Sequence, residues 1–82
     1  MVTHEWRHRT EEGELRFVRA KKHGDTWTLQ ARLKSEEHWT PLDPIPRTDL
    51  EQLRDILHNK YKRRRVPYKD IEQIDALLEH SQ

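Results

Sequence analysis

The chain of 82 residues has room for one small domain, and its 16 basic and 15 acidic side chains leave a net charge of +1. Leu, Ile, Val and Phe make up 17 of the residues, which predicts a thin core, but the balanced charge favours a folded chain over a disordered one. Because there is no cysteine and no long apolar run, the composition argues against a secreted disulfide-rich domain, a thiolate zinc site and a membrane protein, and we expect a cytoplasmic location.

The first half of the chain has the pattern of an antiparallel sheet. Strict alternation of apolar and polar residues over 27–34 predicts a strand with one buried and one solvated face. The run 14–22 is joined to it through a short glycine-containing link, which predicts a hairpin. An earlier strand is expected around His4–Arg9, and the pattern leaves open a short fourth strand centred on Trp39. The sequence therefore predicts a β-meander of three to four strands over about residues 3–41.

The apolar residues of the second strand change face in its middle. Leu15 and Phe17 share one phase of the alternation, whereas Val18 and Ala20 share the other. Because successive side chains point to opposite faces of a sheet, two interpretations are open. Either both faces carry apolar side chains, or a β-bulge shifts the register of the strand.

The second half of the chain is expected to be helical. A proline-rich connector over 41–47 precedes a capping-box pattern in which Thr48 caps the first turn and Glu51 reaches back, so that a helix would run over about 49–61. Pro67 opens a second helix over about 67–79. No internal repeat is apparent. The prediction is thus a single α+β domain over 1–82, an N-terminal antiparallel β-meander followed by two short α-helices.

Basic residues are concentrated at the junction between the two predicted helices. Six positive charges lie within ten residues that contain no acid, while the other 72 residues carry ten basic and fifteen acidic side chains. Such a separation of charge is typical of phosphate-contacting surfaces, in which flanking tyrosines stack on bases. The candidate nucleic-acid-binding residues are Lys60, Tyr61, Lys62, Arg63, Arg64, Arg65, Tyr68 and Lys69.

Two other interpretations of this cluster are open. Cations are favoured at a helix C-terminus, so the residues could form a solvated structural junction. They could also bind an acidic protein, or the acidic helix faces of a second copy in a homodimer. Four carboxylates are predicted on the solvated face of the second helix, which would confine any phosphate contact to the junction: Asp70, Glu72, Asp75 and Glu79.

The remaining candidates point more strongly to structural roles. A looser basic group on the hairpin is expected mainly to prevent aggregation of exposed strands: Arg16, Arg19, Lys21, Lys22, Arg32 and Lys34. Trp6, Trp27 and Trp39 are expected to fill the core rather than to form a stacking platform on the sheet. The six histidines form no tight ligand motif, so we predict neither a metal nor another cofactor.

A catalytic role has little support. Serine occurs only at positions 35 and 81, cysteine is absent, and Gly13 and Gly24 form no phosphate-binding loop. We therefore expect a non-enzymatic domain that binds DNA, RNA or another polyanion through the junction. The alternative is a protein-interaction or homodimerisation module with no nucleic-acid role.

Overall fold

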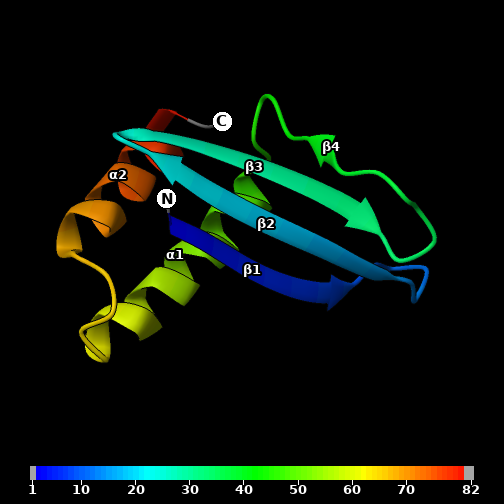
Figure 1. The fold of residues 1–82 in the computed structure, drawn as a ribbon, viewed down its shortest axis with the longest axis horizontal. Coiled ribbons are helices and arrows are strands. Elements are labelled where there is room, and N and C mark those ends of the chain that lie inside the picture. The colour runs from blue at the N-terminus through cyan, green and yellow to red at the C-terminus, as the bar shows by residue number, and fades with distance from the viewer. Residues whose placement is uncertain (1, 81–82) are drawn as a thin grey trace. The chain divides into compact units, whose positions relative to one another are not determined.

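The computed structural model describes residues 2–80 and confirms the α+β class (Figure 1). The chain separates into two compact units, Met1–Pro44 and Ile45–Gln82. The first contains the four strands, so the meander has four strands rather than three. The elements are β1 (Val2–Arg9), β2 (Leu15–His23), β3 (Thr26–Leu33), β4 (Thr40–Pro41), α1 (Arg47–Lys62) and α2 (Tyr68–His80).

The first unit is an antiparallel sheet in the order β1-β2-β3-β4. The hairpin between β2 and β3 closes through a two-residue turn in which Gly24 has φ of 58°. A positive φ at the first turn position is strained for other residues, and it matches the twist of the two strands. The predicted strands and this hairpin are confirmed. The fourth strand is displaced from its expected centre at Trp39 to the next two residues.

Pairing of β2 with β3 settles the change of face within β2. Phe17 pairs with Arg32 and Val18 with Ala31, so the register continues through this point without a bulge. Val18 therefore faces one side of the sheet and Phe17 the other. One face carries the buried side chains of the unit: His4, Val18, Ala20, Trp27, Leu29 and Ala31. The interpretation that both faces carry apolar groups is correct.

The short strand β4 explains how proline fits into the sheet. Pro41 pairs with Gln30 at the edge, and the Leu42 amide donates to the carbonyl of Leu29 at 2.9 Å. Because proline lacks an amide hydrogen, it is tolerated at an edge where one side of the strand needs no ladder bonds. This strand positions Trp39, the preceding residue, beside β3.

The second unit is a pair of helices, α1 and α2, that pack against each other. The capping-box prediction for α1 is wrong. The helix begins two residues earlier than expected, its N-cap is Pro46 with no side-chain cap, and Glu51 pairs instead with Arg47 (Oε1 to Nε, 3.5 Å). Proline already has the extended conformation of an N-cap residue, here with φ of −60° and ψ of 141°, so Thr48 lies inside the first turn.

The two helices also share a sequence pattern, which contradicts the expectation of no internal repeat. The segments 46–57 (PRTDLEQLRDIL) and 67–78 (PYKDIEQIDALL) align without a gap, and the shared positions have the same structural roles. In each, an aspartate three residues after the proline is buried and its amide donates to the proline carbonyl at 3.1 Å. The buried apolar pairs also correspond: Leu50 with Ile71 and Leu53 with Ile74.

Within residues 2–80, neither helix is long and apolar enough to cross a membrane.

Candidate nucleic-acid interface

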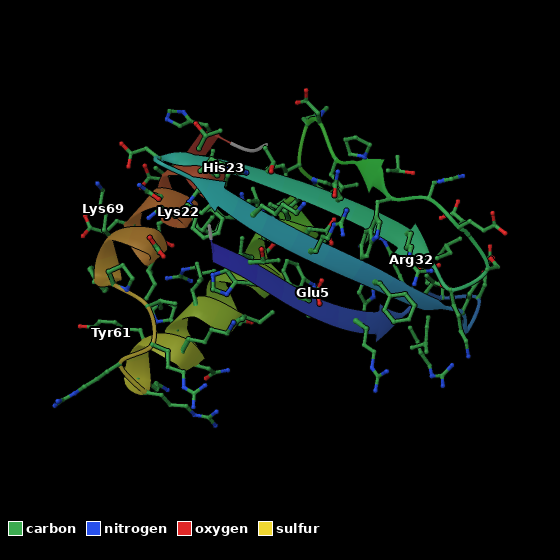
Figure 2. The ribbon with its side chains drawn as sticks, viewed as in Figure 1. Glu5, Lys22, His23, Arg32, Tyr61 and Lys69 are labelled. Carbon is green, nitrogen blue, oxygen red and sulfur yellow. The ribbon has the colours of Figure 1, made fainter. Side chains whose placement is uncertain are left out.

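The junction cluster, defined as the eight predicted residues from Lys60 to Lys69, spans the end of α1, the connection and the start of α2. Seven of its side chains are exposed and Lys60 is partly buried. Figure 2 shows Tyr61 beside the connection and Lys69 near the start of α2. The two helices thus hold the ends of the cluster, and the three arginines occupy the turn between them.

A hydrogen-bonded turn fixes the backbone of the three arginines. The amide of Arg65 donates to the Lys60 carbonyl at 2.9 Å, and that of Arg64 to the Tyr61 carbonyl at 2.8 Å. This pair of bonds is the Schellman motif that ends many helices. Arg64 occupies the position where glycine is usual and has φ of 59°, the left-handed region that costs a non-glycine residue about 1–2 kcal/mol.

The arginine side chains are available to a ligand. Among residues 2–80, no carboxylate forms an ion pair with Arg63, Arg64 or Arg65. In contrast, Arg54 in α1 pairs with Asp75, and Arg47 at the start of α1 pairs with Glu51. The three arginines of the junction therefore carry positive charge that no carboxylate of residues 2–80 neutralises through an ion pair.

Two tyrosines and a shallow concavity accompany these charges. Tyr61 and Tyr68 are 44% and 49% exposed, and their ring centroids lie 5.4 Å apart at 57°. A concavity of about 570 Å³ opens beside them. Its lining includes half of the predicted site and leaves out Lys60, Arg63, Tyr68 and Lys69; the lining residues are Tyr61, Lys62, Arg64, Arg65, Val66 and Pro67.

The acidic face predicted for the second helix is smaller than expected. Asp70 is 2% exposed and belongs to the helix start, so its assignment to the solvated face is wrong. Asp75 is partly buried and paired with Arg54. Only Glu72 and Glu79 of the four carboxylates are exposed. The exposed face of this helix therefore carries less negative charge than the sequence suggests, and it would repel a polyanion less strongly.

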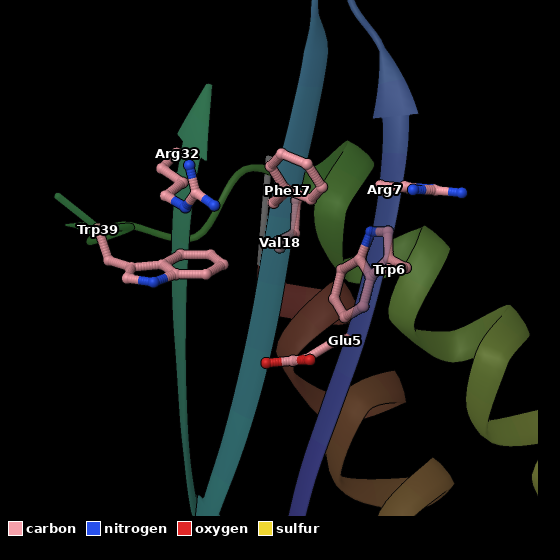
Figure 3. A pocket seen from close by; sticks show the side chains of 7 residues that line it. All are labelled: Glu5, Trp6, Arg7, Phe17, Val18, Arg32 and Trp39. Carbon is pink, nitrogen blue, oxygen red and sulfur yellow. The ribbon is translucent and has the colours of Figure 1, made fainter. Parts of the chain in front are cut away.

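A second cluster, not predicted as a site, lies on the exposed face of the sheet. A pocket of about 520 Å³ opens there, and we call it the sheet pocket (Figure 3). Trp39 projects into it from the segment before β4 and lies beside Arg32, and Phe17 lies between Trp39 and β1. The lining residues are Glu5, Trp6, Arg7, Phe17, Val18, Arg32 and Trp39.

Arginine and aromatic side chains stack on one another around this pocket. The Arg32 guanidinium lies 4.8 Å from the Phe17 ring centroid and 5.4 Å from that of Trp39. Arg19 lies 4.2 Å from the Trp39 ring and donates from Nε to Gln30 Oε1 at 2.7 Å. Arg19 and Arg32 belong to the group expected mainly to limit aggregation, and the stacking gives them a second, local role.

The three tryptophans differ in burial and in position. Trp27 is 7% exposed and stacks on His4 with centroids 5.9 Å apart, as expected for a core residue. Trp6 pairs with Val18, so it lies on the same side of the sheet as the core and is partly buried there. Trp39 is also partly buried but belongs to the stacked groups of the sheet pocket, so its assignment to the core is wrong. Within residues 2–80, no three His, Asp or Glu side chains are grouped to hold a metal ion.

Comparison with known proteins adds no assignment: no family model, curated protein or solved structure matches the chain.

Proposed function

We propose that the protein is a non-enzymatic module that binds nucleic acid through the junction cluster. The observation that carries this proposal is the run of three exposed arginines without a carboxylate partner in the described chain. A structural junction would need one or two cations near the helix end, whereas four consecutive basic residues repel one another. A polyanion relieves that repulsion, and each arginine can form a forked contact with a phosphate.

The conformation of Arg64 supports a role for its side chain. Glycine at this position would form the same turn without the left-handed strain. Stability of the fold therefore favours glycine, while a phosphate-binding surface favours arginine. Strain of this kind at one residue is typical of functional sites.

The contacts would be mainly to the phosphate backbone. The concavity is open and lined by Lys62, Arg64 and Arg65, with the Tyr61 ring available to stack on a base. Such a surface positions a nucleic acid without reading its sequence, and its affinity falls steeply as salt rises. We propose no cofactor and no catalytic residue. A cytoplasmic location, where nucleic acid is accessible, belongs to the same proposal.

The test is titration of labelled single-stranded and duplex oligonucleotides at about 50 and 200 mM salt. Replacement of two junction charges, Arg63→Gln with Arg65→Gln, should lower affinity at least ten-fold at low salt and reduce the slope of log K against log salt by about 1.4–1.8. The matched control, Arg9→Gln with Lys34→Gln, removes two exposed charges from the sheet unit and should leave most of the affinity.

Two outcomes would overturn the proposal. Equal losses in the junction and control variants would mean that net charge, not the junction, determines binding. Failure to bind any oligonucleotide at 50 mM salt, together with binding to an acidic polypeptide such as polyglutamate, would indicate a protein partner instead. Sedimentation at several concentrations tests the homodimer directly.

A further inference from the structure

We infer that the sheet pocket is a second binding site, which takes the unpaired bases of single-stranded nucleic acid. This inference rests on the proposed function for the class of ligand, and it adds a different site and a preference for single strands. The starting observation is that aromatic rings and arginines are gathered on the face of the sheet opposite the buried one.

The pairing register assembles this surface from three strands. Two neighbouring cross-strand rows form it: Glu5, Arg19 and Gln30 in one, and Arg7, Phe17 and Arg32 in the next. Trp39 contacts both rows, since its ring lies within 5.4 Å of the Arg19 and Arg32 guanidinium carbons. The side chains are therefore held on the rigid strands or against them, which preorganises the site.

The stacked arrangement suits a planar ligand that carries negative charge. Four partly buried side chains place flat groups side by side: Phe17, Arg32, Trp39 and Arg19. A nucleobase can add to such a group by stacking on an aromatic ring or a guanidinium plane. An extended acidic peptide would use the arginines but would leave the aromatic rings and the pocket of about 520 Å³ largely unfilled.

The two exposed charged residues of the pocket are expected to contact different parts of a nucleotide, its phosphate and its base. Arg7 is exposed and forms no ion pair within the described residues, so it is placed to contact a phosphate. Glu5 also lines the pocket and is exposed, and its carboxylate only accepts hydrogen bonds. Cytosine, adenine and guanine offer amino groups to such an acceptor, whereas uracil and thymine offer only N3–H, and the two carbonyl oxygens that flank it repel a carboxylate. The pocket should therefore favour amino-bearing bases over uracil.

The experiment compares single-stranded and duplex oligonucleotides of equal length, with the full chain and its variants. Trp39→Leu should weaken binding of single-stranded oligo(C) about ten-fold and leave duplex affinity unchanged, because only unpaired bases can stack. The junction variant, Arg63→Gln with Arg65→Gln, should weaken both. Glu5→Gln, a nearly isosteric change at an exposed site, should reduce the preference for oligo(C) over oligo(U) about three-fold or more.

Arg7→Gln and Lys34→Gln test the site without disturbing its stacked core. Both remove one exposed charge from the sheet unit, but only Arg7 lines the pocket, so only Arg7→Gln should weaken single-strand binding, by about three-fold. Equal effects of Trp39→Leu on single strands and duplex, or identical behaviour of the two charge variants, would overturn the inference while leaving the junction proposal standing. Unchanged binding in the junction variant, with the Trp39 effect present, would overturn the junction and support the sheet pocket.

Discussion

The junction cluster and the sheet pocket use the same residue types in opposite ways. At the junction, arginines follow one another along a turn, and Arg63, Arg64 and Arg65 form no ion pair in the described chain. On the sheet, Arg19 and Arg32 come from separate strands and are held by ring stacking and hydrogen bonds. The first arrangement offers mainly charge, with two exposed tyrosine rings beside it. The second offers charge at fixed positions beside flat rings, as selection among ligands requires.

The largest predicted loss of stability comes from comparing a tryptophan of the core with the tryptophan of the sheet pocket. Trp27→Ala removes a buried ring and should cost about 3–5 kcal/mol, which is comparable to the whole stability expected of a core this small. Trp39→Ala removes a partly exposed ring and should cost about 1–2 kcal/mol. Urea denaturation followed by circular dichroism measures both. Similar losses in the two variants would show that the pocket is part of the core.

This contrast also shows what the sequence could predict. Alternation over 27–34 identified the buried strand face because the period of two is encoded locally. The junction cluster was found because its charges are contiguous. The sheet pocket was missed because its members, from Glu5 to Trp39, are brought together only by the pairing register. A signal was present in Phe17, which is out of phase with Val18, but a bulge would have explained it equally well.

Errors at the helices have a different origin. The pattern Thr48-x-x-Glu51 fits a capping box, but Pro46 begins the helix first, and the capping box cannot form inside a turn. The repeated start of α1 and α2 would have corrected this prediction, since the same spacing from proline to buried aspartate occurs in both helices. Burial of Asp49 and Asp70 could not be read from composition, because aspartate is seldom buried.

A smaller effect should show that the sheet arginines support the fold and the junction arginines do not. Arg32→Gln removes two ring contacts and a donor to the Glu36 carbonyl at 3.0 Å, so it should lower the free energy of unfolding by about 1–2 kcal/mol. Arg65→Gln keeps the backbone hydrogen bond to Lys60 and should change the free energy of unfolding by less than about 0.5 kcal/mol. Equal losses, measured by urea denaturation, would contradict the division between the two regions.

A small gain in stability is the most informative result about the junction, because the same substitution should weaken binding. Arg64→Gly relieves the strain at φ of 59° and should raise the free energy of unfolding by about 0.5–1 kcal/mol, after allowance for the greater freedom of glycine in the unfolded chain. The same change removes one cation from the concavity and should weaken oligonucleotide binding about three-fold or more at low salt. Weaker binding by a more stable protein cannot be attributed to unfolding.

Lys62→Gly, in the last turn of α1, is the matched control for Arg64→Gly. It also removes a cation but should destabilise the helix by up to about 1 kcal/mol. A stabilised Arg64→Gly variant with undiminished affinity would mean that arginine at this position serves neither the fold nor the ligand, and the junction proposal would lose the support that it takes from the conformation of Arg64.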